Sequence, residues 1–400
     1  MDRSAESSDR SARHNPPAPV ILQVLPALGT GGVERGTVDV ARAIVEAGGT
    51  ALVAARGGRL VEELRSAGAL HLDLPVDTKN PIAMARNVTR LQAVIQSHGV
   101  DLVHARSRAP AWSALAAARG ARIPFVTTFH GLYGSKGILK QRYNSIMTRG
   151  DRVIAVSHFV ADHVRRVYRA DASRIRVIPR GVDLQAFDPD AVTPDRVAAL
   201  RREWDVPDDR RVLLLPGRLS EWKGQMALLT AATRLARKDV RIVLAGPAAK
   251  RGDFRRRVVE KADALGLGSV LRITGDVHDM PAAYAAADVV VNASTSPEAF
   301  GRVMAEALAM RRPVVAFDHG AAPEIVEHGR TGWLVPPGDI PELARAIACA
   351  LDLDRSRWRW MGEAGRRRII DDFGKDAMTE RTLQLYEELL SRPFPQRSRD

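Results

Sequence analysis

The sequence predicts an α/β protein made of two parallel-sheet domains of Rossmann type. Three observations carry this prediction. Short apolar runs rich in β-branched residues alternate with helix-length segments, this alternation occurs twice along the chain, and 400 residues are enough for two domains. The apolar runs are continuous rather than alternating, which is typical of strands buried on both faces of a sheet.

The first block of alternating elements predicts an N-terminal domain at residues 19–185. A polar, proline-containing segment at residues 1–18 precedes it, and we expect that tail to be disordered. The predicted strands are 20–25, 51–54, 70–74, 101–104, 123–127 and 152–156. Helical patterns lie between or after them at 34–47, 81–97 and 157–168.

The second block repeats the pattern and predicts a C-terminal domain at residues 186–374. Its predicted strands are 211–215, 240–245, 270–273, 288–292, 313–317 and 333–335. The proline- and glycine-containing stretch from Val177 to Pro189 separates the two blocks. A last predicted helix, at 375–392, comes after the second block and is not followed by another strand. This helix could fold back across the cleft onto the N-terminal domain.

The composition narrows the classes of function. The formal net charge of +13 suggests an anionic partner, such as a nucleic acid, a phosphorylated substrate or an acidic membrane surface, although an arginine-rich composition explains it equally well. The single cysteine, Cys349, excludes an intrachain disulfide framework and a cysteine-based zinc site. Neither a membrane span nor a secretory signal is recognisable, so we expect a cytoplasmic protein, with the inner face of the membrane left open.

Candidate functional residues follow the strands, because ligands of open α/β sheets bind beyond the carboxyl ends of the strands. After the first strand, Gly31 and Gly32 precede a helix and suit either a phosphate or a tight turn. His130 follows the strand at 123–127, where it can bind a sugar hydroxyl or a phosphate oxygen, or serve only as a loop residue.

Two cations follow the first strand of the second block. Gly217 and Arg218 come directly after the strand, and Lys223 lies near the start of the next helix. A cation at a helix N-terminus is disfavoured by the helix dipole unless an anion lies beside it. The loop therefore predicts a diphosphate site between Arg218 and Lys223.

The segment from Ser296 to Glu306 gives the sharpest signal. Glu298 precedes a predicted helix and Glu306 lies on it, so both carboxylates can face one cleft from different depths. One can bind a sugar ring and the other a ribose diol, with phosphates over the helix N-terminus between them. The alternative is that both are ordinary surface and helix-face glutamates.

With these motifs in this order, the chain resembles the retaining glycosyltransferases of family 4, which have the GT-B fold. The motifs are the glycine loop 29–32, Phe129-His130-Gly131, the segment 179–183, Gly217-Arg218 with Lys223-Gly224, the block 298–306 around Phe300-Gly301, and 332–338. The resemblance covers roughly residues 20–390. It implies two Rossmann-like domains around a cleft, with the donor nucleotide held mainly by the second, and transfer with retention that needs neither a metal nor a cofactor.

The resemblance also implies a role for each site residue. The catalytic set comprises Arg218 and Lys223 on the donor diphosphate, Glu298 on the donor sugar, and His130 reaching that sugar from the N-terminal domain. The rest of the donor site comprises Glu306 on the ribose, Val277 at the base, the backbone of Phe300 and Gly301 at the sugar, and Gly31, Gly32, Gly217 and Arg302. Two residues depart from the family pattern: Arg180 replaces a frequent Asn, and Arg302 an aliphatic residue.

The acceptor and the location are less defined. The string from Glu298 to Arg302 is similar to members that build lipopolysaccharide core or other surface glycans, which favours an anionic glycan or glycolipid acceptor. Residues 134–149 combine basic and apolar side chains, as in a helix that lies on anionic lipid or in an ordinary domain helix. Asp188-Pro189-Asp190 fits a metal-binding Asp-x-Asp only in its letters, since it follows no strand.

Other functions remain as alternatives. A sugar-nucleotide epimerase or a phosphorylase would use the same architecture, and a pseudo-glycosyltransferase would bind the donor without transfer. A basic nucleic-acid-binding protein is the non-enzymatic alternative. The 5% aromatic content and the interleaving of acidic with basic residues argue against it, so no nucleic acid is expected as a partner.

Overall fold

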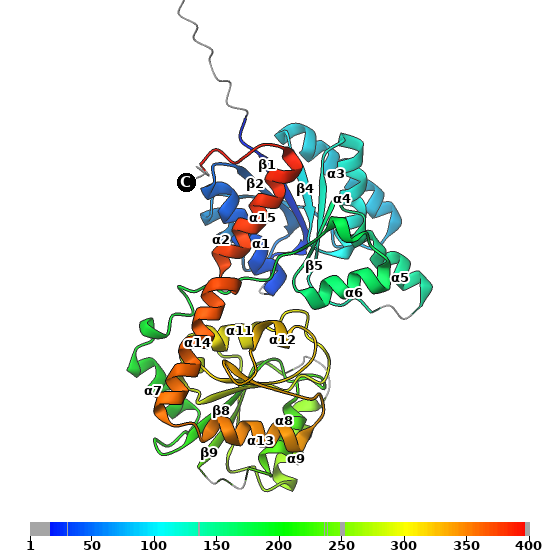
Figure 1. Cartoon of the computed structure of the whole chain (residues 1–400). Coiled ribbons are helices and arrows are strands. Elements are labelled where there is room, and N and C mark those ends of the chain that lie inside the picture. The colour runs from blue at the N-terminus through cyan, green and yellow to red at the C-terminus, as the bar shows by residue number, and fades with distance from the viewer. Residues whose placement is uncertain are drawn as a thin grey trace, which may run out of the picture.

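The computed structural model describes residues 17–29, 31–134, 137–235, 237, 239–248 and 253–396. These residues form two α/β domains that face each other, each built on one parallel sheet (Figure 1). The predicted fold class of two Rossmann-like domains is confirmed. All but the last two residues of the predicted disordered tail, 1–18, lie outside the described residues.

The N-terminal domain has a seven-stranded parallel sheet in the order β3-β2-β1-β4-β5-β6-β7. Its strands are β1 (Val20–Ala27), β2 (Thr50–Arg56), β3 (Leu70–Asp73), β4 (Leu102–Ala105), β5 (Phe125–Phe129), β6 (Arg152–Ala155) and β7 (Ile175–Val177). Its helices are α1 (Gly32–Glu46), α2 (Val61–Ser66), α3 (Pro81–His98), α4 (Arg108–Ala121), α5 (Ile138–Asn144) and α6 (His158–Tyr168). β7 is absent from the predicted strands, because three residues interrupted by an arginine give too short an apolar run.

The C-terminal domain has a six-stranded parallel sheet in the order β10-β9-β8-β11-β12-β13. Its strands are β8 (Arg211–Pro216), β9 (Val240–Ala245), β10 (Leu271–Gly275), β11 (Val289–Asn292), β12 (Val314–Phe317) and β13 (Gly332–Val335). Its helices are α7 (Pro194–Glu203), α8 (Gln225–Ala232), α9 (Phe254–Ala264), α10 (Met280–Ala286), α11 (Arg302–Ala309), α12 (Ala322–Ile325), α13 (Ile340–Leu351) and α14 (Arg355–Phe373).

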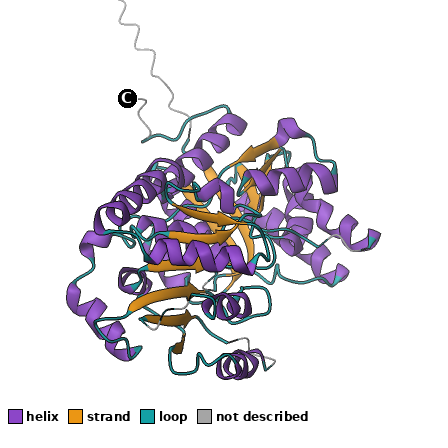
Figure 2. Cartoon of the chain, turned by 60° about the horizontal axis from the view of Figure 1, so that its bottom comes forward, coloured by secondary structure: helices purple, strands orange, loops and turns teal. Residues whose placement is uncertain are grey.

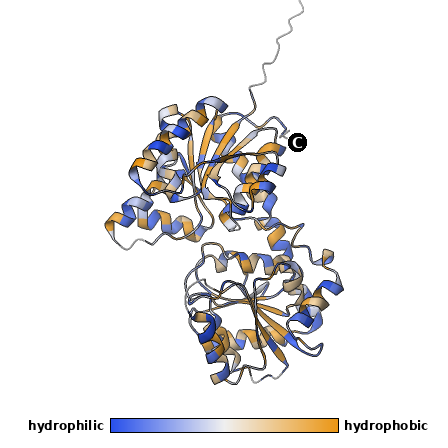
Figure 3. Ribbon diagram, turned by 180° about the vertical axis from the view of Figure 1, so that it is seen from behind, coloured by the Kyte–Doolittle hydropathy of each residue, from blue (hydrophilic) through white to orange (hydrophobic). Residues whose placement is uncertain are grey.

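Helices cover both faces of each sheet, which explains the continuous apolar runs of the strands. In Figure 2 the strands lie between layers of helices, and in Figure 3 the strands are the most uniformly hydrophobic elements. Every residue of β4, β9, β11 and β12 is buried. Burial on both faces removes apolar surface from water along the whole strand, so polar residues at alternate positions would be costly.

The chain crosses between the domains twice, and the two crossings are hydrogen-bonded to each other. Val182 donates its N–H to the carbonyl of Phe373 at 2.8 Å, and Lys375 donates to the carbonyl of Val182 at 2.9 Å. A Cβ at Gly181 would lie 2.3 Å from Cα of Lys375, so only glycine permits this approach. The predicted domain boundary, between residues 185 and 186, falls in the segment that connects the two sheets. Its exact position stays a prediction.

The last helix, α15 (Lys375–Leu390), lies against the N-terminal domain beside α1 (Figure 1). Tyr386 is fully buried there, in one apolar cluster with residues of β1 and α1. Its hydroxyl lies 2.6 Å from Nδ1 of His104, whose Nε2 lies 2.7 Å from Oγ1 of Thr128. The end of the chain is therefore part of the core of the first domain.

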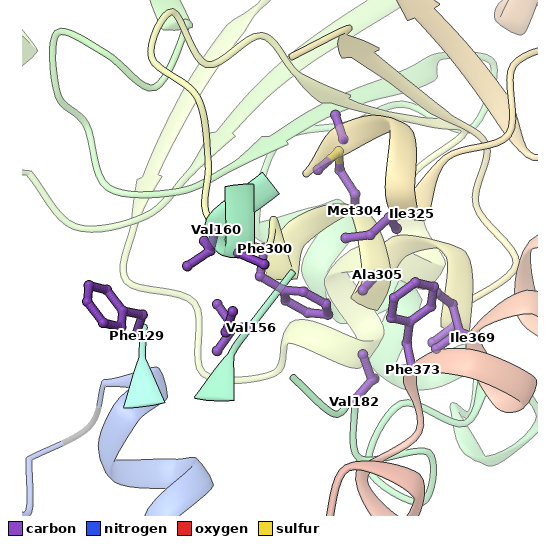
Figure 4. Packing of buried hydrophobic residues seen from close by; sticks show 14 of the residues in the cluster. Phe129, Val156, Val160, Val182, Phe300, Met304, Ala305, Ile325, Ile369 and Phe373 are labelled. Carbon is purple, nitrogen blue, oxygen red and sulfur yellow. The ribbon is translucent and has the colours of Figure 1, made fainter. Parts of the chain in front are cut away.

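A continuous apolar core joins the two domains below the cleft. Phe300 of the C-terminal domain is 4% exposed, and its ring centroid lies 5.9 Å from that of Phe373. Val156 and Val160 of the N-terminal domain belong to the same cluster and lie beside Phe300 (Figure 4). Packing at this point fixes the loop that precedes α11 against the opposite domain.

Candidate active site

A pocket of about 330 Å³ lies between the two domains. Residues of α1, of the ends of β4 and β5, of the crossing at 180–183, of α11 and of α15 line it. Four residues of the predicted site are among its lining: Gly32, His130, Arg302 and Glu306. The structure thus brings predicted residues of both domains to one cavity.

Glu306 is held by two neighbours. Its Oε2 accepts a hydrogen bond from the hydroxyl of Tyr284 at 2.9 Å. Its Oε1 accepts from Nε and Nη2 of Arg302 at 3.1 and 2.8 Å. Burial, followed by the Glu306 charge, raises the pKa of Tyr284 well above its usual value, so this phenol stays a proton donor. The carboxylate is thereby fixed at the wall of the pocket.

Lys223 and Glu298 form an ion pair, although the resemblance assigns them to different parts of the donor. Nζ of Lys223 lies 2.9 Å from Oε1 of Glu298, and both side chains are largely buried. The same oxygen accepts from Oγ of Ser294 at 2.6 Å and from Nδ2 of Asn292 at 3.3 Å. The pair follows the carboxyl ends of β8 and β11, which are adjacent in the sheet. It does not line the interdomain pocket.

Glycines position the cationic loop after β8. Gly217 has φ +142° and Gly224 has φ +85°, both in the region that favours glycine. A Cβ at Gly224 would lie 2.0 Å from the carbonyl oxygen of Ala293, so glycine lets the loop with Lys223 lie against the end of β11. Arg218 is exposed at this edge, and among the described residues its side chain has no hydrogen bond or ion pair.

The other predicted donor residues lie at the same edge of the second sheet or at the start of α1. Gly301 has φ +87° and immediately precedes α11, while the Phe300 side chain is buried in the interdomain core. Val277 follows β10 and is partly buried against the main core. Gly31 is exposed in the position before α1, where its carbonyl accepts from Arg35 N at 3.0 Å.

His130 has two ring nitrogens that are buried and have no hydrogen-bond partner among the described residues. Burial lowers its pKa well below the usual value, and the Arg180 and Arg106 charges add to the effect. The imidazole is therefore neutral, with one nitrogen as donor and the other as acceptor. A sugar hydroxyl can use both functions, which fits the role that the resemblance implies.

Guanidinium groups of both domains meet at the start of α1. A Cβ at Gly32 would lie 2.4 Å from Nη1 of Arg180 and 3.3 Å from Nη1 of Arg302. Arg180 donates to the carbonyl of His130 at 3.4 Å. Burial lowers its pKa to about 10, and the nearby Arg302 and Arg106 charges contribute. The two departures from the family pattern, Arg180 and Arg302, thus lie together in the pocket.

Several charged residues of the pocket were not predicted from the sequence, among them Arg35, Arg106 and Asp39. Arg106 is 5% exposed and donates from Nη1 to Oε1 of Gln23 at 2.9 Å. It follows the strand at 101–104, so the rule that selected His130 could have found it. Asp39 lies in the middle of α1, and a helix-face aspartate carries no signal of a site.

The Asp39 carboxyl group should give the protein a pH-dependent stability. Burial, the largest influence, raises its pKa from 3.8 to about 6, against the lowering effects of Lys375, Arg35 and Arg106 and with a raising effect of Asp183. The folded state holds this proton more tightly than the unfolded chain, so the group's contribution to stability falls as pH rises from about 4 to about 6. Asp39→Asn should therefore gain stability over the wild type at pH 7 but not at pH 4, as measured by urea denaturation. A difference that is equal at both pH values would contradict this.

Two parts of the C-terminal domain, the loop from Glu298 to Gly301 and Glu324 of α12, contact the start of α6 in the N-terminal domain. Ser157, which precedes α6, donates from Oγ to the carbonyl of Ala299 at 2.6 Å. The Glu324 carboxylate of the C-terminal domain accepts from the backbone N–H groups of His158 and Phe159 at 2.8 and 2.7 Å. A carboxylate at free N–H groups of a helix N-terminus is stabilised by hydrogen bonding and by the helix dipole. These contacts hold the loop from Glu298 to Gly301 against α6.

Among the described residues, no helix is long and apolar enough to cross a bilayer. Within the same ranges, no three His, Cys, Asp or Glu side chains come together in a way that could hold a metal ion. The aspartates of the Asp188-Pro189-Asp190 string are paired with Arg366 and Arg311.

Two facing Rossmann-like domains with polar residues gathered at their cleft match the GT-B class of glycosyltransferases. The family model described as Glycosyltransferase Family 4 matches residues 30–186, and that described as Glycosyl transferases group 1 matches residues 197–368. The chain belongs to glycosyltransferase family 4.

Individual relatives support this assignment. The chain is 32% identical over 256 residues to the D-inositol 3-phosphate glycosyltransferase of Saccharomonospora viridis. This alignment covers 62% of the chain and 57% of the relative, so the chain spans less than two thirds of the relative's length. A crystal structure of a glycosyltransferase from Rickettsia africae is 37% identical, with a TM-score of 0.87 over 93% of this chain and 99% of the other. Anabaena HepE in complex with UDP-glucose is 26% identical, with a TM-score of 0.79 over 92% and 100%.

Proposed function

We propose that this glycosyltransferase moves a sugar from a nucleoside diphosphate sugar to a glycan or glycolipid, with retention of configuration and without a metal. The observation that carries the proposal is the Lys223–Glu298 pair at the carboxyl ends of β8 and β11, with Arg218 in the same loop as Lys223 and Glu306 on the helix that follows Glu298. Cations for a diphosphate and carboxylates for hydroxyl groups then come from one edge of one sheet. The similarity to a protein crystallised with UDP-glucose makes UDP-sugars the first donors to test.

The difficult event in this reaction is departure of the nucleoside diphosphate, on which negative charge grows. Lys223 has three N–H donors and Glu298 takes one, so a phosphate oxygen can bind without loss of the pair. Arg218 has no protein partner among the described residues and is free to bind the same group. Fixed positive groups aimed at developing charge need no reorganisation during the reaction, and such stabilisation is commonly the largest contribution to catalysis.

Glu298 and His130 orient the donor sugar in this proposal. Glu298 accepts hydrogen bonds from sugar hydroxyls through the carboxylate oxygen that Lys223, Ser294 and Asn292 leave free. The neutral His130 ring offers one donor and one acceptor from the opposite domain. Glu306, fixed by Tyr284 and Arg302, accepts from the ribose hydroxyls.

The direct test is a thermal-shift series with UDP-, GDP- and ADP-sugars. A donor present at 100 times its dissociation constant should stabilise the folded protein by about 2.7 kcal/mol. One nucleotide series should stabilise it, and the matching labelled donor should yield a product with the donor's anomeric configuration, equally with and without EDTA. Salt-sensitive RNA binding with no response to any sugar nucleotide would favour the nucleic-acid-binding alternative instead.

An anionic acceptor fits the arginines of the pocket. Arg35, Arg106, Arg180 and Arg302 line it together with Asp39, Asp183 and Glu306, and Arg180 and Arg302 depart from the family pattern. Charge-assisted hydrogen bonds from guanidinium groups are well suited to carboxylates and phosphates. Phosphorylated or acidic sugars of a lipopolysaccharide or another surface polysaccharide have this chemistry, so we place the enzyme in surface-glycan synthesis.

Contact with an anionic membrane is part of this proposal. On α5, Ile138 and Leu139 are 83% and 85% exposed beside Lys140 and Arg142, whereas Ile146 and Met147 farther along are buried. Lys136, in the same predicted segment, lies outside the described residues. Exposed apolar side chains next to cations suit the surface of an anionic bilayer.

Liposome flotation tests the membrane contact. The protein should float with vesicles that contain anionic lipid at low salt, and less at high salt because the attraction is partly electrostatic. Ile138→Ser with Leu139→Ser should lower the bound fraction several-fold without a change in melting temperature, since neither side chain is buried. Equal flotation with neutral and anionic vesicles would contradict the proposal.

A further inference from the structure

A second pocket, of about 400 Å³, lies wholly within the C-terminal domain and is lined by four arginines: Arg201, Arg211, Arg312 and Arg355. Arg211 is the first residue of β8, and Arg312 comes two residues before β12. The pocket is therefore at the amino ends of the strands. The donor residues follow the carboxyl ends, so this cavity is at the opposite edge of the sheet from the candidate active site.

The positive charge of this pocket is not balanced by its own residues. Asp288 is the one acidic residue of the lining that the structure describes. Its Oδ1 accepts from Nη1 of Arg211 at 2.8 Å, and its Oδ2 accepts from the backbone N–H of Val212 at 2.7 Å. Arg201, Arg312 and Arg355 form no ion pair with any described residue. Arg201 uses Nη2 for the carbonyls of Pro207 and Arg210, at 2.8 and 3.1 Å. The cavity thus carries an excess of positive charge toward a ligand.

Arg312 is the residue that most needs a partner. Its Nε is buried and has no hydrogen-bond partner among the described residues. Its guanidinium lies 4.8 Å from the ring centroid of Trp358, and the Trp358 indole is fixed by donation from Nε1 to the carbonyl of Asp288 at 3.2 Å. Burial lowers the Arg312 pKa to about 10. Burial of a cation without a bound anion costs free energy. The Trp358 ring offsets part of that cost for Arg312, but it contacts only one face of the guanidinium.

The remaining wall of the pocket is apolar. Val197, Leu351, Leu353 and the alanines 285–287 belong to the same lining as the arginines. Cavities of this size that combine apolar side chains with convergent polar groups are typical of small-molecule sites. Guanidinium groups bind phosphate in two-pronged geometry, and three of them without ion pairs suit a group with more than one negative charge.

We propose that this pocket is a second binding site, for a small phosphorylated molecule whose phosphate binds Arg312, Arg201 and Arg355 and whose body lies on the apolar wall. The site is separate from the donor site and does not depend on the proposed function.

The test uses inorganic phosphate as the probe, at constant ionic strength, with the melting temperature and calorimetric binding as readouts. The wild-type protein should bind phosphate and melt at a higher temperature with it. Arg312→Met should bind at least tenfold more weakly and lose most of that shift, yet melt no lower than the wild type without phosphate, because it removes an unpaired cation. Arg359→Met is the matched control, an exposed arginine of α14 outside the lining, and should behave as the wild type.

A variant of the donor site separates the two cavities. Lys223→Ala should keep the phosphate response if the arginine pocket produces it, and the double variant with Arg312→Met should lose it. If Arg312→Met is unstable, Arg355→Gln at the exposed start of α14 should still weaken phosphate binding several-fold. Absence of a phosphate response in the wild type, an undiminished response in Arg312→Met, or its complete loss in Lys223→Ala alone would overturn the proposal.

Discussion

Lys223→Ala should lower kcat for sugar transfer by about a hundredfold, which corresponds to about 3 kcal/mol of activation free energy. The ammonium group lies at the carboxyl end of β8, 2.9 Å from Glu298, where it can neutralise the departing diphosphate. Loss of the ammonium group also removes the ion-pair partner of Glu298, so Glu298 should hold the donor sugar in a less defined orientation. Arg218→Ala should show a loss of the same order, because it removes the other cation of the loop.

The measurement is the initial rate with saturating donor, together with the melting temperature of each variant. Arg218 is exposed and has no partner among the described residues, so Arg218→Ala should melt as the wild type does. Lys223→Arg keeps the charge but changes its geometry and should retain more activity than Lys223→Ala. Arg359→Ala is a control, an exposed cation on α14. Normal turnover in both Arg218→Ala and Lys223→Ala would refute the proposed role of the loop.

Tyr386→Ala should lower the free energy of unfolding by about 3–5 kcal/mol, the range for deletion of a large buried aromatic side chain. Tyr386 is fully buried in the N-terminal core, and its hydroxyl lies 2.6 Å from Nδ1 of His104. Burial lowers the pKa of His104 well below its usual value, so this hydrogen bond joins two neutral groups. Tyr386→Phe keeps the ring and should cost only about 1–3 kcal/mol, through the unsatisfied imidazole nitrogen.

Chemical denaturation monitored separately for each domain distinguishes the outcomes. The transition of the N-terminal domain should move, although the substituted residue lies at the other end of the sequence. A shift of the C-terminal transition alone, or equal losses in Tyr386→Phe and Tyr386→Ala, would show that α15 does not stabilise the first domain in this way.

The fold was predictable because its main signal is local. Twelve apolar runs, each compatible with burial on both faces of a sheet, identified every strand except β7, where Arg176 interrupts a run of three residues. The order of the strands, with β1 and β8 near the middle of their sheets, follows from parallel pairing across helical crossovers and not from any single run.

The candidate site was predictable only in part. Residues in the loops that follow strands, such as Arg218 and Glu298, could be found because the carboxyl ends of parallel strands converge. Their direct pairing could not, since the spacing of Lys223 and Glu298 in the sequence, 75 residues apart, says nothing of contact. Asp39 was missed for a related reason: it enters the pocket from the side of a helix, where aspartate is common on any solvated surface.

The paired crossings at Val182 and Gly374 have a consequence for attempts to take the molecule apart. Because α15 is anchored among the core residues of the first half, a single proteolytic cut between β7 and β8 leaves the halves attached. A fragment that ends near residue 185 would expose the apolar strip that Leu383, Leu385 and Tyr386 cover, and should aggregate. Independent production of the first half therefore requires that the last helix be supplied with it, either in trans or by circular permutation.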